Sequence, residues 1–442
     1  MADFPQHQPY KPRRHHRRLR DWLPFMLVLA GLGAGWYAYT YHGVAVAPSK
    51  EPPTVILSMP DRGRILGVDA VQPFTVAEAA SIAHENYGGL TPPVATAVTK
   101  ITFHYRSYDI NGQALVVYGR AYLPAEPTGR LPIFAFAPGT TGIGDRCAAS
   151  LEQPHVVNWG NYDSHMVTYA SQGYAAVITD YEGMRDPDRI HHYMVGELEG
   201  RALLDAVRAL RKLPQTLGRL DDQSVFLSGY SQGGHAAFWA DKIQPDYAPE
   251  LTVRGVVGFG PVMSVKETLA DVVHGANINW FGPYVLTSYS DYYGRNYGLT
   301  NILLPNRLAH LGADVQAHCI DSVLPFWGNT PTGVYTPEFI AALQADDWSP
   351  FAVLSSDLDK NTVGDQTTAS AKRINEGQFD NVVLPRQQTA ILPTLCAKSR
   401  GPVQYVVYPN ATHYNTMVQS LKDTLAWMAD LRAGQPVAGT CQ

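Results

Sequence analysis

A single serine between two glycines, directly after an apolar run, constrains this chain more than any other feature. The stretch reads Phe226-Leu-Ser-Gly-Tyr-Ser-Gln-Gly-Gly234. Its apolar start at residues 225–227 predicts a buried strand, and residues 233–243 predict a helix. Ser231 then stands on a tight turn, where the close strand and helix backbones require small residues two positions before and after it. The motif predicts a nucleophilic serine on that turn, and a plain Ser/Gly turn is the alternative.

The rest of the chain alternates between strand and helix patterns. Asn111-Gly112 is a good hairpin turn between the first two predicted strands, so we expect an antiparallel pair at the front edge. Predicted strands cover residues 100–108, 114–122, 132–137, 174–179, 225–227, 253–259 and 403–408, and predicted helices cover 197–213, 233–243 and 417–428. This alternation predicts an α/β fold, with a mostly parallel central sheet and helices on both faces.

The N-terminal part of the chain has the pattern of an export signal. Residues 1–21 hold six basic and two acidic side chains, and residues 22–41 form an uncharged, largely apolar run. That run is long enough for a membrane-spanning helix, and the basic flank orients its start toward the cytoplasm. We expect an uncleaved signal-anchor that contacts the membrane. The alternative is a signal peptide cleaved after Ala47, although Pro48 hinders cleavage.

The remainder of the chain is expected to be one exported domain. Residues 42–60 contain four prolines and predict a linker, which leaves residues 61–442 as the folded body. The net charge of the whole chain is −5, and because its first 21 residues are basic, the body is more acidic still. An acidic body argues against nucleic acid as a partner.

The cysteines indicate disulfide bonds rather than a metal site. Four are present, at positions 147, 319, 396 and 441. In an exported chain disulfides are the default, and the spacing leaves all three pairings open. The patterns Cys-x-x-Cys, His-x-x-x-His and His-Glu-x-x-His do not occur in the sequence, so we expect no metal.

The alternation of strands and helices breaks between about residues 262 and 350. This stretch is rich in tryptophan, tyrosine and phenylalanine. A structureless loop of that length is improbable inside a compact domain, so the segment predicts an inserted helical cap, or lid, over the serine. The alternative is a packed side domain with no role in substrate binding.

A serine hydroxyl is a poor nucleophile at neutral pH and needs a histidine base that a carboxylate orients. His413 follows the last predicted strand, where it can reach the end of the sheet. The acid is expected in a loop between the insert and that strand, and Asp380 fits best. The competing acids are Asp357, Asp359 and Asp365. The histidines of the insert are expected to be packing or surface residues: His274, His310 and His318.

Charge that develops on a substrate oxygen needs hydrogen-bond donors near the serine. One donor is expected to be the backbone N–H of Gln232, the residue after the nucleophile. The second is expected from the glycine-rich residues 137–144, where Thr140 can also offer its hydroxyl. A plain glycine-rich turn is the alternative.

The loop after the predicted strand at residues 174–179 is expected to form the rim of the pocket. Three of its aspartates and two histidines are the residues of interest. The histidines, His191 and His192, are expected to be structural rather than catalytic. The aspartates are Asp180, Asp186 and Asp188.

With these residues in hand, the chain resembles the secretory lipase family of the α/β-hydrolase superfamily, the group of the fungal lipase A type. The resemblance rests on motifs that stand in the family's order over about residues 75–430. Besides the serine motif they are Pro138-Gly-Thr-Thr-Gly-Ile-Gly-Asp-Arg-Cys147, Asp180-Tyr-Glu-Gly-Met184, Asn361-Thr-Val-Gly364, Glu376-Gly-Gln-Phe-Asp380 and Ala411-Thr-His413.

The resemblance implies a Ser231–Asp380–His413 triad and a lid inserted after the sixth core strand. It also implies two disulfides, Cys147–Cys319 and Cys396–Cys441. One departure concerns the strand before the acid, which should be apolar and buried. Here residues 370–374 carry two adjacent cations.

The function that follows is ester hydrolysis through an acyl-enzyme on Ser231, as in a lipase or carboxylesterase, with acylglycerols or other acyl esters as substrates. Such chemistry needs no metal or organic cofactor. Three alternatives stay open on the same fold. An acyltransferase would use the same triad, a peptidase would hydrolyse amides, and a membrane-tethered binding protein would not use the triad at all.

Overall fold

The computed structural model describes Met59, residues 61–153 and residues 158–441. The predicted basic N-terminus (1–21), the apolar run (22–41) and nearly all of the predicted linker lie outside the described residues. Within the described part of the chain, no helix is both long enough and apolar enough to cross a membrane.

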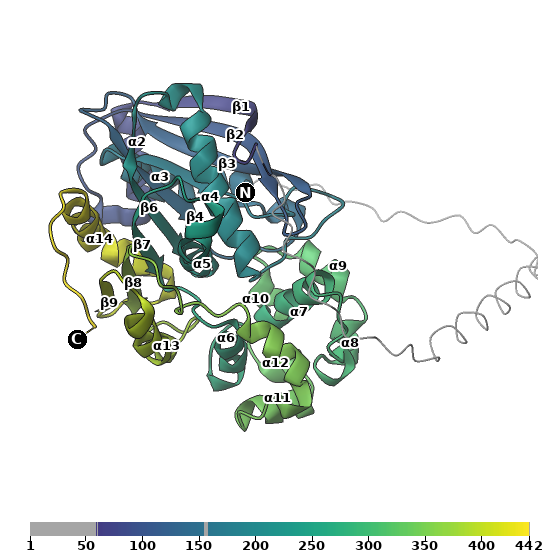
Figure 1. Ribbon diagram of the computed structural model, residues 1–442. Helices are drawn as coiled ribbons and strands as arrows, with labels where there is room; N and C mark the ends of the chain where they lie inside the picture. The colour runs from purple at the N-terminus through teal and green to yellow at the C-terminus, as the bar shows by residue number, and fades with distance from the viewer. Residues whose placement is uncertain (1–58, 60, 154–157, 442) are drawn as a thin grey trace, which may run out of the picture. The chain divides into compact units, whose positions relative to one another are not determined.

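A nine-stranded sheet forms the centre of the described domain (Figure 1). The strand order is β1-β2-β3-β5-β4-β6-β7-β8-β9, with β1, β2, β3 and β5 antiparallel to one another in turn and all later neighbours parallel. The strands are β1 (Ile65–Phe74), β2 (Val98–Tyr108), β3 (Ala114–Pro124), β4 (Leu131–Ala137), β5 (Ala175–Thr179), β6 (Leu220–Tyr230), β7 (Val253–Phe259), β8 (Ala371–Gly377) and β9 (Val403–Tyr408). The expected α/β-hydrolase architecture is confirmed.

Helices cover both faces of this sheet and fill the stretch between β7 and β8. They are α2 (Val76–Tyr87), α3 (Tyr162–Ser171), α4 (Gly196–Lys212), α5 (Gln232–Tyr247), α6 (Val265–Asp271), α7 (Phe281–Tyr292), α8 (Pro305–Leu308), α9 (Leu311–Ala317), α10 (Val323–Trp327), α11 (Pro337–Gln344), α12 (Ala352–Asp359), α13 (Pro385–Lys398) and α14 (Thr416–Arg432).

The two faces of the sheet belong to two separate apolar cores, as β4 illustrates. Ile133 and Ala135 pack with residues of α4 and α5, whereas Phe134 and Phe136 pack with residues of α3 and α14. Successive side chains of a strand point to opposite faces, so a strand covered on both sides is apolar throughout. This is why β4 is buried along its whole length.

The predicted hairpin is present, and one edge of the sheet was not predicted. β2 and β3 pair antiparallel over their full length, joined through the expected turn, where Gly112 has a φ of +76°. The edge strand β1 and the helix α2 had no prediction. A reciprocal cap starts α2: Thr75 accepts a hydrogen bond from the N–H of Glu78, and the Glu78 carboxylate accepts one from the N–H of Thr75.

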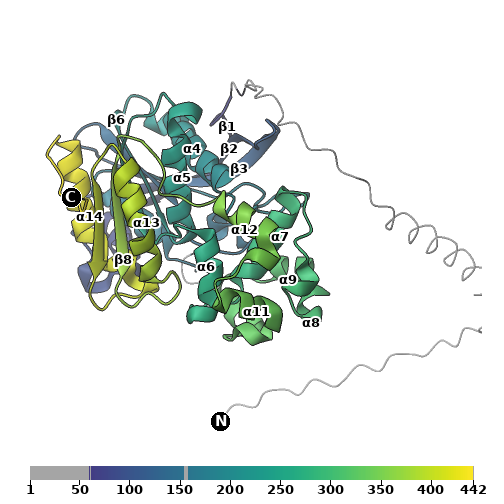
Figure 2. The same cartoon turned by 60° about the horizontal axis from the view of Figure 1, so that its bottom comes forward.

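The helices between β7 and β8 form a third core. Its members include Trp280, Tyr284, Trp327 and Phe339, all buried. Figures 1 and 2 show helices α6 to α12, in green, gathered at one end of the sheet. Helical structure continues past the predicted boundary at about residue 350, to the end of α12 at Asp359. The role of this segment as a lid stays a prediction.

The two adjacent cations lie in β8, where the resemblance implies an apolar strand. Both are buried, and both have polar partners. Lys372 Nζ lies 3.4 Å from an oxygen of Asp241 and donates to the carbonyl oxygen of Ser370 at 2.8 Å. Arg373 donates from Nη2 to the hydroxyl of Tyr408 at 2.8 Å. Burial lowers the pKa of Lys372. Paired in this way, the cations leave the strand able to lie inside the sheet.

The four cysteines stand in two pairs at disulfide distance. The sulfur atoms of Cys147 and Cys319 are 2.07 Å apart, and those of Cys396 and Cys441 are 1.98 Å apart. The first pair joins the loop after β4 to the helical segment. The second joins α13 to the C-terminal end of the chain.

Candidate active site

The serine motif folds as a sharp turn between β6 and α5. Ser231 has a φ of +55°, a strained value for a residue with a side chain. A Cβ added at Gly229 would lie 1.9 Å from the carbonyl oxygen of Gly233, and one added at Gly233 would lie 1.9 Å from that of Ala137. No side chain fits at either position, which explains the glycines of the motif and the strain at the serine between them.

His413 and Asp380 meet at the ends of the last two strands. His413 stands directly after β9, and its Nδ1 lies 2.6 Å from Asp380 Oδ2. The other carboxylate oxygen accepts the backbone N–H groups of Val382 and Val383, each at 2.9 Å. Gly260 closes over the pair, since a Cβ there would be 3.0 Å from His413 Nδ1. The contacts hold the carboxylate in one orientation toward the imidazole.

The competing acids lie elsewhere and have other partners. Asp357 accepts hydrogen bonds from Tyr297 and Lys360, within and beside α12. The other two form exposed ion pairs, Asp359 with Lys266 and Asp365 with Lys242. Of the four candidate acids, Asp380 alone forms a hydrogen bond with His413 among the described residues.

Ser231 and His413 line the same cavity, which has a volume of about 240 Å³. Thr140 lines it too, so the cavity brings together three of the predicted site residues. The helical segment contributes mainly apolar side chains. The remaining lining residues are Asn158, Trp159, Tyr230, Asn277, Trp280, Ile320, Asp321, Val323, Leu324, Val382 and Tyr414.

Of the two predicted oxyanion-hole residues, Gln232 follows Ser231 in the chain and Thr140 lines the same cavity as Ser231. Gln232 is the first residue of α5, so its N–H belongs to the helix end whose donors have no acceptor within the helix. Thr140 is buried, and its Oγ1 lies 2.8 Å from the hydroxyl of Tyr193. The oxyanion role of both residues stays a prediction.

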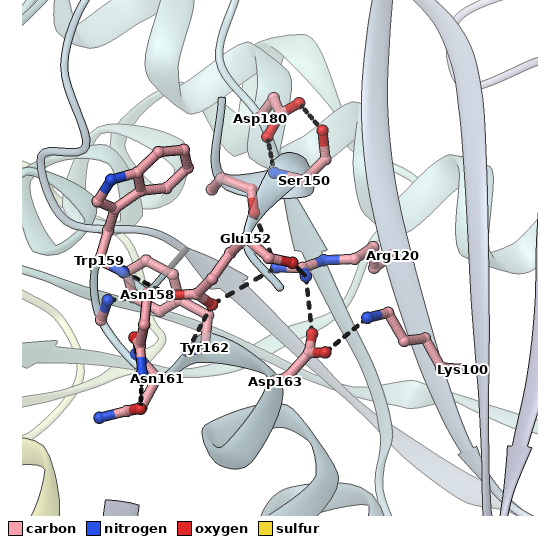
Figure 3. Close-up of polar contacts among 12 residues, drawn as sticks. Lys100, Arg120, Ser150, Glu152, Asn158, Trp159, Asn161, Tyr162, Asp163 and Asp180 are labelled. Atoms are coloured by element: carbon pink, nitrogen blue, oxygen red, sulfur yellow. Dashed lines mark hydrogen bonds and ion pairs between the residues drawn. The ribbon is translucent and has the colours of Figure 1, made fainter. Parts of the chain in front are cut away.

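A buried ionic network holds one wall of the cavity (Figure 3). Glu152 accepts the backbone N–H groups of Trp159, Gly160 and Tyr162 at 2.8 to 3.0 Å. Arg120 donates to the carbonyl oxygen of Glu152 at 3.1 Å. The sequence did not point to Trp159 or its neighbour in the wall, because their place depends on these contacts.

The same arginine holds the start of helix α3. Its Nη1 lies 2.7 Å from Asp163 Oδ1, and Lys100 Nζ lies 2.5 Å from the other oxygen of that carboxylate. Burial opposes the charge of Asp163, yet the guanidinium and the ammonium outweigh it and hold the pKa of Asp163 below its usual value. The network therefore carries its charges inside the domain as pairs.

A second carboxyl group lies buried beside Asp380. Glu376 is fully buried, and its Oε1 accepts the N–H of Gly377 at 3.0 Å. Burial, and then the negative charge of Asp380, raise the pKa of Glu376 well above its usual value. A neutral carboxyl group is the form that suits this position.

The sequence predicted that the loop after β5 forms the rim of this cavity. That prediction is wrong, because no described residue of the loop lines the cavity. Asp180 is buried and accepts the N–H of Ser150 at 2.7 Å. Asp186 and Asp188 line a separate hollow together with His192. The start of the loop is instead held against the turn that carries Ser150.

The histidines that we expected to be non-catalytic lie outside the cavity lining. His191 and His192 are bound within the loop between β5 and α4. In the helical segment, His318 stacks on Phe326. The described residues hold no group of three His, Cys, Asp or Glu side chains that could bind a metal ion.

The chain that forms this site matches a known protein family. The model of the secretory lipase family matches residues 160–440, which is more than half of the chain. The chain belongs to the secretory lipase family. The match covers the serine motif, Asp380 and His413.

Individual relatives agree with this assignment. Lipase A of Moesziomyces aphidis is 31% identical over 181 residues, which are 39% of this chain and 37% of that protein. The chain thus spans little more than a third of that relative's length.

Two solved structures share the fold. A rice cell wall degrading esterase, LipA from Xanthomonas oryzae, is similar with a TM-score of 0.68 and 19% identity, over 85% of this chain and 100% of that one. Candida antarctica lipase A is similar with a TM-score of 0.64 and 20% identity, over 86% of this chain and 84% of that one.

Proposed function

We propose that this protein is an exported serine ester hydrolase that cleaves carboxylic esters through an acyl-enzyme on Ser231. The observation that carries the proposal is the shared cavity of Ser231 and His413, with Asp380 at 2.6 Å from the far nitrogen of that histidine. A serine, a histidine and a carboxylate in this relation form a nucleophile with its base and its orienting acid. The relatives named lipases and esterases support the reaction class.

The reaction begins with His413. Because its Nδ1–H donates to Asp380, its Nε2 is left without a proton and acts as the base for Ser231. The serine oxygen attacks the ester carbonyl, and the N–H of Gln232 and the donors of Thr140 stabilise the charge on the carbonyl oxygen. His413 then protonates the leaving alcohol, and later activates the water that releases the acid.

The cavity supports short-chain esters as substrates. Its volume of about 240 Å³ lies below the usual range of roughly 300–1,000 Å³ for ligand pockets. The apolar side chains of Ile320, Val323 and Leu324 suit an acyl chain, while Asn158 and Asn277 suit a polar part of the ester. The helical segment supplies all three of these apolar side chains and acts as the lid.

Export is supported by the two cysteine pairs at disulfide distance, because such bonds persist in oxidising compartments. The family is one of secretory proteins. The apolar run at residues 22–41 acts as the signal-anchor or signal peptide.

The test is hydrolysis of a series of p-nitrophenyl esters, from acetate to palmitate, by the full-length protein and its Ser231→Ala variant. We expect activity highest for short chains and a loss of at least about 10⁴-fold in the variant. Ser228→Ala is the matched control. It removes a buried serine of the same strand, whose hydroxyl donates to the carbonyl oxygen of Ala135 at 2.9 Å, and should remain active.

Two outcomes would contradict the proposal. Near-wild-type rates in Ser231→Ala would exclude that serine as the nucleophile. Release of p-nitrophenol only when an acceptor alcohol is added, with the acyl group recovered on that alcohol, would identify an acyltransferase.

A further inference from the structure

A short segment between β5 and α4, residues 191–194, contacts both residues that we place at the oxyanion hole. The hydroxyl of Tyr193 lies 2.8 Å from Thr140 Oγ1, and His191 Nε2 lies 2.7 Å from Gln232 Nε2. All four side chains are buried. One segment thus holds a side chain on the loop after β4 and a side chain on the first turn of α5.

The contact with Gln232 has a defined direction. His191 Nδ1 lies 3.2 Å from the carbonyl oxygen of Glu182, which can only accept, so Nδ1 carries the ring proton. The other nitrogen then accepts a hydrogen bond from the Gln232 amide. Burial lowers the pKa of His191, which keeps the ring neutral. Tyr181 stacks on the ring at 4.9 Å and fixes its plane.

A fully buried carboxylate, Glu199 of α4, accepts the second hydrogen bond of the same amide. Its Oε1 lies 2.7 Å from Gln232 Nε2 and also accepts the N–H of Met194 at 3.0 Å. Its Oε2 lies 2.7 Å from His235 Nδ1, and His235 Nε2 lies 2.7 Å from the carbonyl oxygen of Asn361. Since that carbonyl only accepts, His235 donates to it, and its Nδ1 stays in hydrogen-bond contact with Glu199.

These acceptors decide how the Gln232 amide is oriented. Its NH2 group donates one hydrogen bond to His191 and one to Glu199. Its Oε1 is buried without a donor among the described residues. Turning the amide over would set Oε1 against the Glu199 carboxylate, and two acceptors repel. The first turn of α5, next to Ser231, is therefore held in one position by residues that do not line the cavity.

Helix α7 of the helical segment holds the backbone of residues 191–194 in place. The Ser288 hydroxyl donates to the carbonyl oxygen of His191 at 3.1 Å, and the Tyr289 hydroxyl donates to that of Met194 at 3.0 Å. None of His191, Met194 or Glu199 lines the cavity. Their contacts reach the site only through other residues.

We propose that Tyr193, His191 and Glu199 are positioning residues of the oxyanion hole, which act through Thr140 and Gln232. The inference rests on the proposed ester hydrolysis. A donor is effective only when it already points at the place where negative charge develops, and such placement requires support behind it. The tetrahedral intermediates should depend on these residues more than substrate binding does.

The first test is Tyr193→Phe, which removes one oxygen and keeps the ring against Phe281 and Tyr284. We expect kcat for p-nitrophenyl acetate to fall about tenfold with KM little changed, because the variant displaces the donor at Thr140 and leaves substrate binding intact. Affinity for an alkyl boronic acid, which forms a tetrahedral adduct with serine, should fall by a similar factor. Tyr247→Phe is the matched control, since it removes a buried hydroxyl that donates to Asp205 at 2.8 Å, at the far end of α5.

A double-mutant cycle shows whether Tyr193 acts through Thr140. In a Thr140→Val background, which keeps the shape and removes the hydroxyl, Tyr193→Phe should change kcat by less than about twofold. An equal loss in both backgrounds would overturn this part of the inference, since Tyr193 would then act by another route.

The second arm tests the Gln232 side. His191→Phe keeps the stack on Tyr181 and removes the acceptor, and Glu199→Gln keeps the shape and removes the charge. Each should lower kcat and boronic acid affinity together while KM changes little. Thermal unfolding is measured on every variant, so that a folding defect is recognised by a loss of melting transition.

The outcomes separate this inference from the proposed function. If the wild-type protein hydrolyses no ester, the proposed function fails. If the wild type is active and Tyr193→Phe, His191→Phe and Glu199→Gln are folded with the kcat of Tyr247→Phe, the positioning role is wrong and the hydrolase assignment stands.

Discussion

His192 Nε2 lies 2.9 Å from Asp291 Oδ2, and this contact joins the loop after β5 to helix α7. The other ring nitrogen lies 2.7 Å from Glu182 Oε1, so the imidazole stands between two carboxylates. Burial opposes the charge of the ring, but both carboxylates favour it, and the net effect raises the pKa of His192. The charged ring is thus a link between the sheet domain and the helical segment.

This link should make stability depend on pH. A histidine whose folded pKa is raised contributes its full stability below the unfolded value of about 6.5, and the contribution is lost as pH rises through the folded value. We expect Asp291→Asn to lower the melting temperature at pH 5.5 and to have a smaller effect at pH 9. Asp314→Asn, on α9 of the same helical segment, is the control. An equal effect of Asp291→Asn at both pH values would contradict the link.

Asp380→Asn should lower kcat by about 10⁴-fold with little change in KM. The amide oxygen can still accept from Val382 and Val383, so the fold is kept, but the NH2 group would face His413 and favour the wrong tautomer. Asp359→Asn is the matched control, because that competing acid is exposed and forms an ion pair with Lys266. Steady-state kinetics with p-nitrophenyl acetate decides between them, and a larger loss in Asp359→Asn would refute Asp380 as the acid.

Glu376→Gln should change the pH dependence of stability rather than activity at pH 7. For an acid whose folded pKa is raised, stability is fully present below the ordinary glutamate pKa of 4.5 and declines as pH rises toward the folded pKa. The amide cannot ionise, so the variant should gain free energy of unfolding relative to wild type as pH rises from 5 to 9. Urea titrations measure this, with exposed Glu338→Gln on α11 as the control. A relative loss at pH 9 would show that Glu376 is charged in the folded protein.

Arg120→Met should destabilise the protein by about 3–5 kcal/mol, because it leaves the buried charge of Asp163 with one partner fewer. The wall at Trp159 loses its support as well, so activity should fall even at temperatures where the variant is folded. Arg64→Met is the control. Arg64 is exposed and forms an ion pair with Asp61, which predicts a change of less than about 1 kcal/mol. Similar unfolding free energies for the two variants would contradict the structural role of Arg120.

The candidate site illustrates what sequence reasoning can and cannot find. Ser231, His413 and Asp380 stand in short motifs at the ends of predicted strands, so their chain order and local pattern were enough to select them. Glu199 and His235 carry no such signal, since each lies within a helix and reads as an ordinary helical residue. The local pattern around Asp380 favours it over its rivals, and in the structure its carboxylate lies 2.6 Å from His413 Nδ1.

Two parts of the fold show the same limit. The edge strand β1 precedes all the predicted elements and has no strict alternation, because most of it is exposed. The adjacent cations of β8 contradicted a buried strand, yet Asp241 and Tyr408 provide partners from α5 and β9. A pattern of neighbouring residues in the chain contains no information about such distant partners.

The sequence by itself determined the local elements of this protein: the strand–turn–helix around Ser231, the hairpin at Asn111-Gly112, and a histidine after the last strand. These follow from periodicity, turn chemistry and the need for glycine where backbones touch. Only the tertiary structure decided which distant groups meet, such as His191 with Gln232, Tyr193 with Thr140 and His192 with Asp291. Those contacts depend on how two sheet faces and a separate helical core pack together, and packing over long distances in the chain leaves no local trace.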